Sequence, residues 1–282
     1  MVDIKNIAEN LEKGLRDDLE IILSKKIVPK LVSVISKNDP STCIYANSQK
    51  RFAQRLGINY ECIVTDPDID LTSFRNILNK LNSDSSVSGI MLCRPISDKV
   101  KFCEVASLIS AKKDVEGVSP ENLGKLFLGQ NSFVSPVALS CFEIIKKSQL
   151  PLKGKDVVIV GHSYTVGKPL TALLLDKLAT VNICHIGTFE AGKLEEYISR
   201  AEILIVSVGK PELIKAKNIK QGAFVVDVGI NKVADKIVGD VEFSKAKDKV
   251  SYITPVPGGV GCLTTLFLFI NLIKAVKIQH GI

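Results

Sequence analysis

The chain has 282 residues, 46% hydrophobic and 24% charged, which suits one large or two medium globular domains. Its net charge is +7, yet no block of five or more like charges occurs and only 6% of residues are aromatic. This composition lacks the basic patches with interleaved aromatic residues that nucleic-acid binders use, so we expect no nucleic-acid partner. The excess charge either keeps the protein soluble or attracts an anionic small molecule.

Seven cysteines and three histidines occur without a C-x-x-C motif or a spacing typical of metal sites, so we expect no metal. Most cysteines lie in apolar runs, which predicts buried, reduced thiols. The chain starts with a charged, helix-like segment and not with a signal peptide. The longest late apolar stretch, residues 263–273, is short for a membrane span. We therefore expect a cytoplasmic protein with no membrane partner.

Apolar strands alternate with amphipathic helices in the first part of the chain. In chain order, the pattern predicts a helix over 3–25, a strand over 30–35, a helix over 41–56 with Ser41 as its N-cap, a strand over 60–64, a helix over 71–81, a strand over 89–93 and a helix over 100–110. Such an alternation favours a parallel sheet covered on both faces.

A helix over 137–148 leads into a second series. Its predicted strands cover 157–160, 181–185, 203–208, 223–228 and 252–253, its helices cover 165–178, 190–200 and 215–220, and a long terminal helix covers 263–278. The fold class is therefore α/β, with two domains that each hold a mainly parallel sheet flanked by helices, the second domain being Rossmann-like. We expect the first domain over 1–138 plus 263–282, and the second over 139–262.

One glycine turn stands between a predicted strand and a predicted helix. Gly161 and Gly167 frame it, with Ser163 between them and Pro169 near the helix start, where a missing N–H is tolerated. This placement suits a phosphate held at a helix N-terminus, with Ser163 as a further donor. A plain strand–helix turn without a ligand is the alternative.

The residues after the next strand bear on which dinucleotide is bound. An acidic residue there holds the ribose 2′-OH in many NAD sites, but none occurs before Glu190. This favours NADP, with NAD possible. No arginine stands ready for the 2′-phosphate, which leaves His162, Thr188 and Lys193 as polar candidates.

Five ordered blocks resemble the bacterial methylenetetrahydrofolate dehydrogenase / methenyltetrahydrofolate cyclohydrolase family over nearly the whole chain. They are Lys113-Asp114-Val115-Glu116-Gly117, the turn at 161–169, Val226-Asp227-Val228-Gly229-Ile230-Asn231, Gly239-Asp240-Val241, and the segment 253–261 that contains Pro255-Val256-Pro257-Gly258-Gly259. The resemblance implies a two-domain α/β homodimer of one-carbon metabolism. It also implies a tetrahydrofolate derivative in a cleft between the domains and a nicotinamide dinucleotide on the second domain.

The resemblance also assigns residues to the two ligands. The dinucleotide would contact Gly161, His162, Ser163, Thr165, Gly167, Thr188, Val208, Gly209 and Ile230. The folate would contact Tyr45, Glu116, Pro257, Gly258 and Gly259.

The catalytic positions of the first domain depart from the family pattern. Tyr45 matches a Tyr-x-x-x-Lys motif whose two side chains share one helix face, but the lysine position holds Gln49. Lys50 is adjacent and points about 100° away around the helix. The family's glutamine after the third strand is Cys93, and the second aspartate of its Asp-Val-Asp-Gly motif is Glu116.

These changes affect the two reactions of the family differently. Hydride transfer depends on positioning, and Glu116 can stabilise the positive charge of the methenyl product. Hydrolysis of the methenyl bridge needs a group that carries a proton, and glutamine does not titrate. We therefore expect dehydrogenase activity to survive and cyclohydrolase activity to be weakened, unless Lys50 substitutes. A catalytically silent folate or nucleotide binder and a shikimate-type dehydrogenase are the alternatives.

Overall fold

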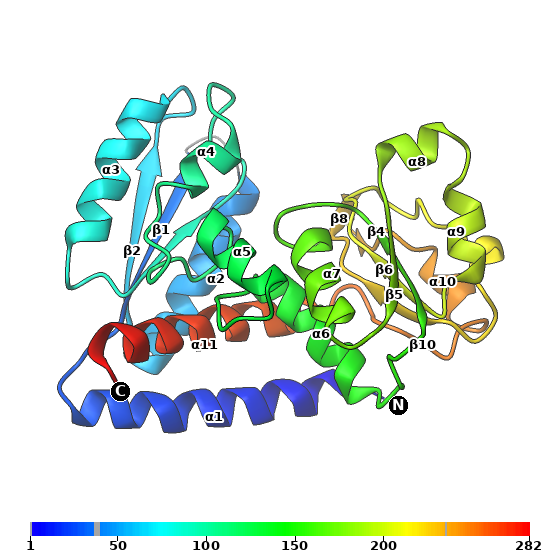
Figure 1. Cartoon of the computed structure of the whole chain (residues 1–282), viewed down its shortest axis with the longest axis horizontal. Helices are drawn as coiled ribbons and strands as arrows, with labels where there is room; N and C mark the ends of the chain where they lie inside the picture. Colours follow the sequence, from blue (N-terminus) through cyan, green and yellow to red (C-terminus); the bar gives the residue numbers. More distant parts are fainter. Residues whose placement is uncertain (1, 37–39, 235) are drawn as a thin grey trace. The chain divides into compact units, whose positions relative to one another are not determined.

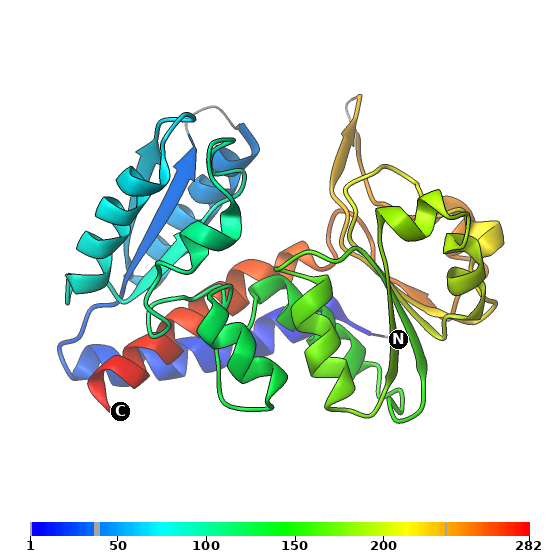
Figure 2. The ribbon, with the colours of Figure 1, turned by 45° about the horizontal axis from the view of Figure 1, so that its top comes forward.

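The computed structural model describes residues 2–36, 40–234 and 236–282 and separates into two compact units (Figures 1 and 2). We call Glu9–Ser135 with Thr265–Ile282 the three-stranded unit, and Met1–Ala8 with Pro136–Thr264 the five-stranded unit. The first and last long helices, α1 (Ile4–Ser24) and α11 (Gly261–His280), contribute residues to both. The domain limits expected from the sequence stay a prediction.

The sheet of the three-stranded unit is parallel and has the order β2-β1-β3. Its strands are β1 (Lys30–Ser36), β2 (Asn59–Thr65) and β3 (Gly89–Leu92). The helices wholly within this unit are α2 (Pro40–Leu56), α3 (Leu71–Ser83), α4 (Phe102–Ala106) and α5 (Pro120–Phe127).

Alternate residues of β1 and β3 face opposite layers, as expected for strands buried on both sides. Val32 and Val34 pack with Phe74 of α3 in one core cluster, which also holds Val105 of α4. The intervening Ser33 faces α2, where it meets Gln49. The sheet thus directs one polar side chain toward the helix that carries the predicted catalytic residues.

The five-stranded unit has a wholly parallel sheet of order β10-β7-β6-β4-β5. The strands are β4 (Asp156–Val160), β5 (Thr180–Cys184), β6 (Ile203–Val206), β7 (Phe224–Asp227) and β10 (Tyr252–Ile253). The chain runs from β4 outward to β5 and then returns to β6 on the other side of β4. Ligands in open α/β sheets bind where the strand order reverses in this way.

Helices flank both faces of this sheet, as Figure 1 shows. They are α6 (Pro136–Lys147), α7 (Gly167–Leu175), α8 (Ile186–Glu190), α9 (Leu194–Arg200) and α10 (Phe243–Ala246). An antiparallel hairpin, β8 (Asn231–Val233) and β9 (Lys236–Val238), follows β7. Both units therefore confirm the predicted α/β class with mainly parallel sheets.

Several predicted elements differ from the structure for local reasons. The helix expected over 190–200 begins only at Leu194, because Gly192 adopts a positive φ of 68° and separates α9 from the short helix α8, which ends at Glu190. The helix expected over 215–220 is a single 3₁₀ turn, Ala216–Asn218. Helix α2 begins at Pro40, so Ser41 lies within the helix and not before it; its side chain lies outside the described residues.

Two expectations drawn from composition need correction. Of the six cysteines with described side chains, Cys62, Cys103 and Cys262 are exposed, so the pattern of apolar runs overstated thiol burial. Helix α11 is, among the described residues, the one helix long and apolar enough to cross a membrane. The length of this helix therefore does not exclude a membrane span. However, 61% of its apolar segment is buried inside the protein, which is typical of a core helix.

Candidate active site

The predicted phosphate turn follows β4 and shows the backbone geometry that only glycine permits. Gly161 has a φ of 121°, and a side chain there would collide with the carbonyl group of Ser207. Gly167 packs against the carbonyl oxygen of Gly161, so it cannot be larger either. The Ser163 hydroxyl accepts a hydrogen bond from the Val166 amide at 3.1 Å, which closes the turn.

Two backbone amides of this turn are available to an anion. The N–H groups of His162 and Ser163 donate no hydrogen bond to another residue of the described chain. Because they precede helix α7, the partial positive charge of the helix N-terminus adds to their attraction for a phosphate.

A cavity of about 320 Å³ opens beside the turn, at the carboxyl ends of β4, β5 and β6. It is lined by Val160, Gly161, His162, Ser163, His185, Ile186, Phe189, Leu194, Ser207, Val208, Lys210 and Leu213. Four predicted cofactor residues line it: Gly161, His162, Ser163 and Val208. Thr165, Gly167, Thr188, Gly209 and Ile230 are not in its lining.

Sequence reasoning missed His185, which directly follows β5 and is the N-cap of α8. The rings of His162 and His185 lie 5.3 Å apart between centroids. Nδ1 of His185 accepts a hydrogen bond from the Gly187 amide at 3.1 Å, and Thr188 Oγ1 accepts one from the His185 amide at 3.2 Å. An Nδ1 that accepts leaves the ring proton on Nε2, so His185 retains a donor.

Lys210, Val208 and Gly209 follow β6, and their amides bind a side chain of the protein. All three N–H groups donate to the carboxylate of Asp240, at 2.9, 2.7 and 3.0 Å respectively. The backbone amide of Gly209 is therefore engaged within the fold, and the loop presents the Val208 and Lys210 side chains to the cavity.

In the three-stranded unit, Gln49 is fully buried on α2, in contact with the sheet. Its Oε1 accepts hydrogen bonds from Ser33 Oγ at 2.9 Å and Tyr60 Oη at 3.1 Å, while Nε2 donates to Met91 Sδ at 3.1 Å. A hydrogen bond from Gln49 also lowers the pKa of Tyr45, as expected when the phenol oxygen accepts the second N–H. The amide of Gln49 is thus fully committed to protein groups.

Tyr45 lies one helical turn before Gln49 and is half-buried. Burial and the nearby charge of Glu116 raise the pKa of the Tyr45 phenol well above its usual range, so it stays protonated. Cys93, after β3, behaves alike: burial, then Glu116, raises the pKa of its thiol. The structure therefore brings together four predicted catalytic side chains: Tyr45, Gln49, Cys93 and Glu116.

Glu116 is buried, and its Oε2 has no hydrogen-bond partner among the described residues. Burial, followed by the charge of Asp114, raises the pKa of Glu116 to about 8, although Arg94 and a backbone hydrogen bond from Leu92 oppose the shift. An unpaired buried carboxyl oxygen is costly, so its retention suggests that a ligand supplies the partner.

Lys50 does not join this cluster. It is exposed on α2 and forms no hydrogen bond or ion pair with another described residue. Asp114, in contrast, has a structural role that could not be recognised from the Lys113–Gly117 block alone. Its carboxylate accepts from the amides of Val118 and Ser119 at 3.2 and 2.8 Å, and from Asn122 Nδ2 at 2.9 Å.

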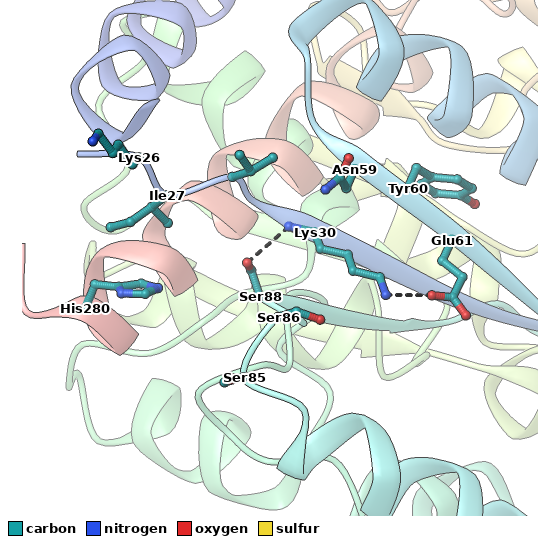
Figure 3. A pocket seen from close by; sticks show the side chains of 11 residues that line it. Lys26, Ile27, Lys30, Asn59, Tyr60, Glu61, Ser85, Ser86, Ser88 and His280 are labelled. Atoms are coloured by element: carbon teal, nitrogen blue, oxygen red, sulfur yellow. Dashed lines mark hydrogen bonds and ion pairs between the residues drawn. The ribbon is translucent and has the colours of Figure 1, made fainter. Parts of the chain in front are cut away.

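A cavity of the three-stranded unit lies elsewhere, at the amino ends of the strands. It measures about 750 Å³, and Figure 3 shows Lys30, Ser88 and His280 among its lining residues. Lys30 Nζ pairs with Glu61 at 2.7 Å, and the Lys30 amide donates to Ser88 Oγ at 3.1 Å. Open α/β sheets bind ligands at the opposite ends of their strands, so we do not assign this cavity to catalysis.

The proline–glycine segment belongs to the five-stranded unit, just before α11. Gly258 has a φ of 100°, and a side chain at Gly259 would collide with the carbonyl oxygen of Pro255. Both positions therefore require glycine. The folate-binding role of Pro257, Gly258 and Gly259 stays a prediction.

Together, the glycine turn at the strand-order reversal and the buried acid in a turn of the unit with the second parallel sheet define a two-unit α/β enzyme with a dinucleotide site. Comparison with known families agrees. Residues 2–116 match the catalytic domain, and residues 135–280 the NAD(P)-binding domain, of tetrahydrofolate dehydrogenase/cyclohydrolase. The chain belongs to the tetrahydrofolate dehydrogenase/cyclohydrolase family.

Individual relatives match the chain over nearly its whole length or all of it. The bifunctional protein FolD of Dictyoglomus thermophilum is 43% identical over 273 residues, 97% of this chain and 95% of its own. The FolD of Staphylococcus saprophyticus is 37% identical over 100% of this chain and 98% of its own.

Solved structures show the same fold. The bifunctional FolD of Campylobacter jejuni superposes with a TM-score of 0.92 at 35% identity, covering 99% of this chain and 98% of its own. The Trypanosoma brucei enzyme, solved with NADP and an inhibitor, has a TM-score of 0.91 at 26% identity, covering 98% and 96%. Shikimate dehydrogenase of Thermus thermophilus shares the fold alone. It is 16% identical and has a TM-score of 0.52, covering 89% of this chain and 99% of its own.

Proposed function

We propose that this enzyme oxidises 5,10-methylenetetrahydrofolate to 5,10-methenyltetrahydrofolate with NADP, and that it hydrolyses the methenyl product slowly. Family membership supports the substrate and both reactions. The observation that carries the difference between the reactions is the buried amide of Gln49, whose hydrogen-bonding groups all bind the protein.

The residues around the dinucleotide cavity suit NADP. The free amides of His162 and Ser163, with the glycines of the turn, match the diphosphate. His162, His185 and Lys210 are donors without a carboxylate among the residues that line the cavity, which suits the additional 2′-phosphate better than a bare ribose hydroxyl. When bound, the cofactor accepts the hydride.

Glu116 serves the oxidation electrostatically. Loss of hydride leaves positive charge on the one-carbon bridge, and an opposite charge nearby lowers a carboxyl pKa. A pKa of about 8 in the free protein therefore means that the forming cation draws the proton off Glu116. The unpaired Oε2 is the atom that would face this cation.

Hydrolysis has different needs, because water must lose a proton as it attacks the bridge carbon. Gln49 carries no transferable proton and retains no group to orient water. Tyr45 stays protonated because burial raises its phenol pKa. Loss of general acid–base catalysis typically costs about 10²–10⁴-fold in rate, so methenyl product accumulates.

The reaction itself tests this proposal. Purified enzyme receives methylenetetrahydrofolate with NADP or with NAD, while reduced-cofactor and methenyl absorbance are followed separately. We expect both absorbances to rise with NADP and the methenyl signal to persist. Methenyl decay as fast as its formation would refute the slow hydrolysis. Absence of reduced cofactor at every substrate concentration would leave a silent binder.

We extend the proposal to assembly and location. A homodimer in the cytoplasm agrees with the expectation from the sequence. Exposed apolar side chains at Ile230, Val233 and Ile237, on and beside the β8–β9 hairpin, supply surface that a second copy could cover. Light scattering of the purified protein tests the assembly, and a monomer at micromolar concentration would refute it.

A further inference from the structure

One loop of the dinucleotide cavity is built around a carboxylate of the protein itself. The amides of three consecutive residues, Val208 to Lys210, converge on Asp240. Asn231 Nδ2 adds a fourth hydrogen bond to this carboxylate at 2.8 Å. Consecutive converging amides form the kind of concavity that binds phosphate in other proteins.

A second buried carboxylate fixes Asp240 in turn. Asp227, at the end of β7, accepts hydrogen bonds from the amides of Asp240 at 3.1 Å, Val241 at 2.9 Å and Gly229 at 2.9 Å. The approach is so close that a side chain at Gly229 would collide with Asp240, and one at Gly239 with Asp227. The two acids therefore form one packed unit with the loops after β6 and β7.

We propose that Asp240 is a positioning residue for the dinucleotide, filling the Val208–Lys210 amide site as an internal anion. This inference rests on the proposed use of a dinucleotide. The carboxylate holds the wall of the cavity in place before the cofactor arrives, which reduces the ordering that binding requires. It also keeps phosphate out of this amide site, so the Gly161–Gly167 turn takes the diphosphate.

The test is Asp240→Asn, in which an NH₂ group replaces an oxygen that accepts backbone N–H groups. NADPH binding is measured by nucleotide fluorescence in the absence of folate, and melting temperature without nucleotide reports folding. We expect the Kd for NADPH and the KM for NADP to rise about tenfold or more, with kcat at saturating NADP within about threefold. A partly unfolded preparation would lower kcat and leave KM unchanged, because only the folded fraction is active.

Two further variants complete the test. Asp176→Asn, an exposed acid at the end of α7, removes the same charge and should leave the Kd unchanged. Asn231→Ala removes one hydrogen bond to Asp240 and should raise the Kd about threefold, which covers the case in which Asp240→Asn fails to fold. A folded Asp240→Asn or Asn231→Ala variant with the wild-type Kd would overturn the proposal. Wild-type protein that binds NADPH but forms no methenyl product would refute the proposed reaction alone.

Discussion

Two buried acids, one in each unit, differ in how fully the protein satisfies their hydrogen-bonding groups. Asp227 and Glu116 are both nearly inaccessible to solvent. Three backbone amides donate to Asp227, and its pKa rises only to about 6 despite burial. Glu116 keeps one oxygen, Oε2, without a hydrogen-bond partner in the described part of the chain, and its pKa rises to about 8.

The difference indicates what each unit completes by itself. In the five-stranded unit, Asp227 and Asp240 accept hydrogen bonds from residues of the same unit, so the loops around the dinucleotide cavity are formed before any ligand arrives. The three-stranded unit satisfies Gln49 but leaves Glu116 without a full set of partners. A neutral Gln49 and an incompletely satisfied Glu116 together favour charge stabilisation over proton transfer.

Restoring a titratable group at residue 49 should produce the largest effect. Gln49→Lys should raise the rate of methenyl hydrolysis about 100-fold, because a lysine desolvated in this buried position has a lowered pKa and can carry a proton. Methenyl absorbance after rapid mixing measures the rate. Gln49→Met, of similar length without a titratable group, is the control; a lysine variant no faster than wild type would contradict our interpretation of Gln49.

Removing the charge of Glu116 should follow in size. Glu116→Gln should lower the dehydrogenase kcat/KM about 10- to 100-fold, because it removes the attraction between a carboxylate and the forming cation, which amounts to up to roughly 4 kcal/mol for charges about 4 Å apart. Steady-state NADPH formation measures this loss. Glu121→Gln, an exposed acid paired with Lys125, is the control in the same unit. A Glu116→Gln rate within twofold of wild type would exclude an electrostatic role.

The histidine pair should decide the choice of cofactor. His162→Ala should lower the ratio of kcat/KM for NADP to that for NAD about tenfold, through loss of a charge-assisted contact to phosphate. His280→Ala is the control. An unchanged ratio in His162→Ala would assign the 2′-phosphate to other residues.

The free energy of unfolding should reveal the unpaired acid directly. The pKa of Glu116 lies at about 8 in the folded protein and at 4.5 in the unfolded chain, so the folded state binds the extra proton between these limits. The stability from this group is complete below pH 4.5 and is lost as pH rises through 8, at up to about 1.4 kcal/mol per pH unit. Glu116→Gln should therefore gain stability relative to wild type from pH 5 to 8. If the free energies of unfolding of Glu116→Gln and wild type differ by the same amount at every pH, Glu116 is not a buried neutral acid.

Lys50 should have the smallest effect. Lys50→Met should leave methenyl hydrolysis within about twofold of wild type, as expected for an exposed residue outside the cluster. The measurement is the same absorbance decay as for residue 49. A larger decrease would show that Lys50 reaches the bridge carbon and replaces the missing lysine.

The sequence by itself determined the fold class and located the glycine turn that we propose for the dinucleotide. Strand periodicity and the spacing of Gly161 and Gly167 are local properties, because the period of apolar residues and the need for a positive φ depend on the chain alone. Tyr45, Gln49, Cys93 and Glu116 were instead found through the resemblance to the family, whose pattern assigns those positions.

Only the tertiary structure decided which polar groups are satisfied. Asp227 and Asp240 stand in ordinary motifs, but hydrogen bonds to distant loops make them structural; Gln49 is committed through Ser33, Tyr60 and Met91 from three different strands. The interruption at Gly192 and the His162–His185 pair were also hidden in the sequence. The physical reason is that burial and hydrogen-bond partners are properties of the neighbourhood in space, which folding assembles from segments far apart in the chain.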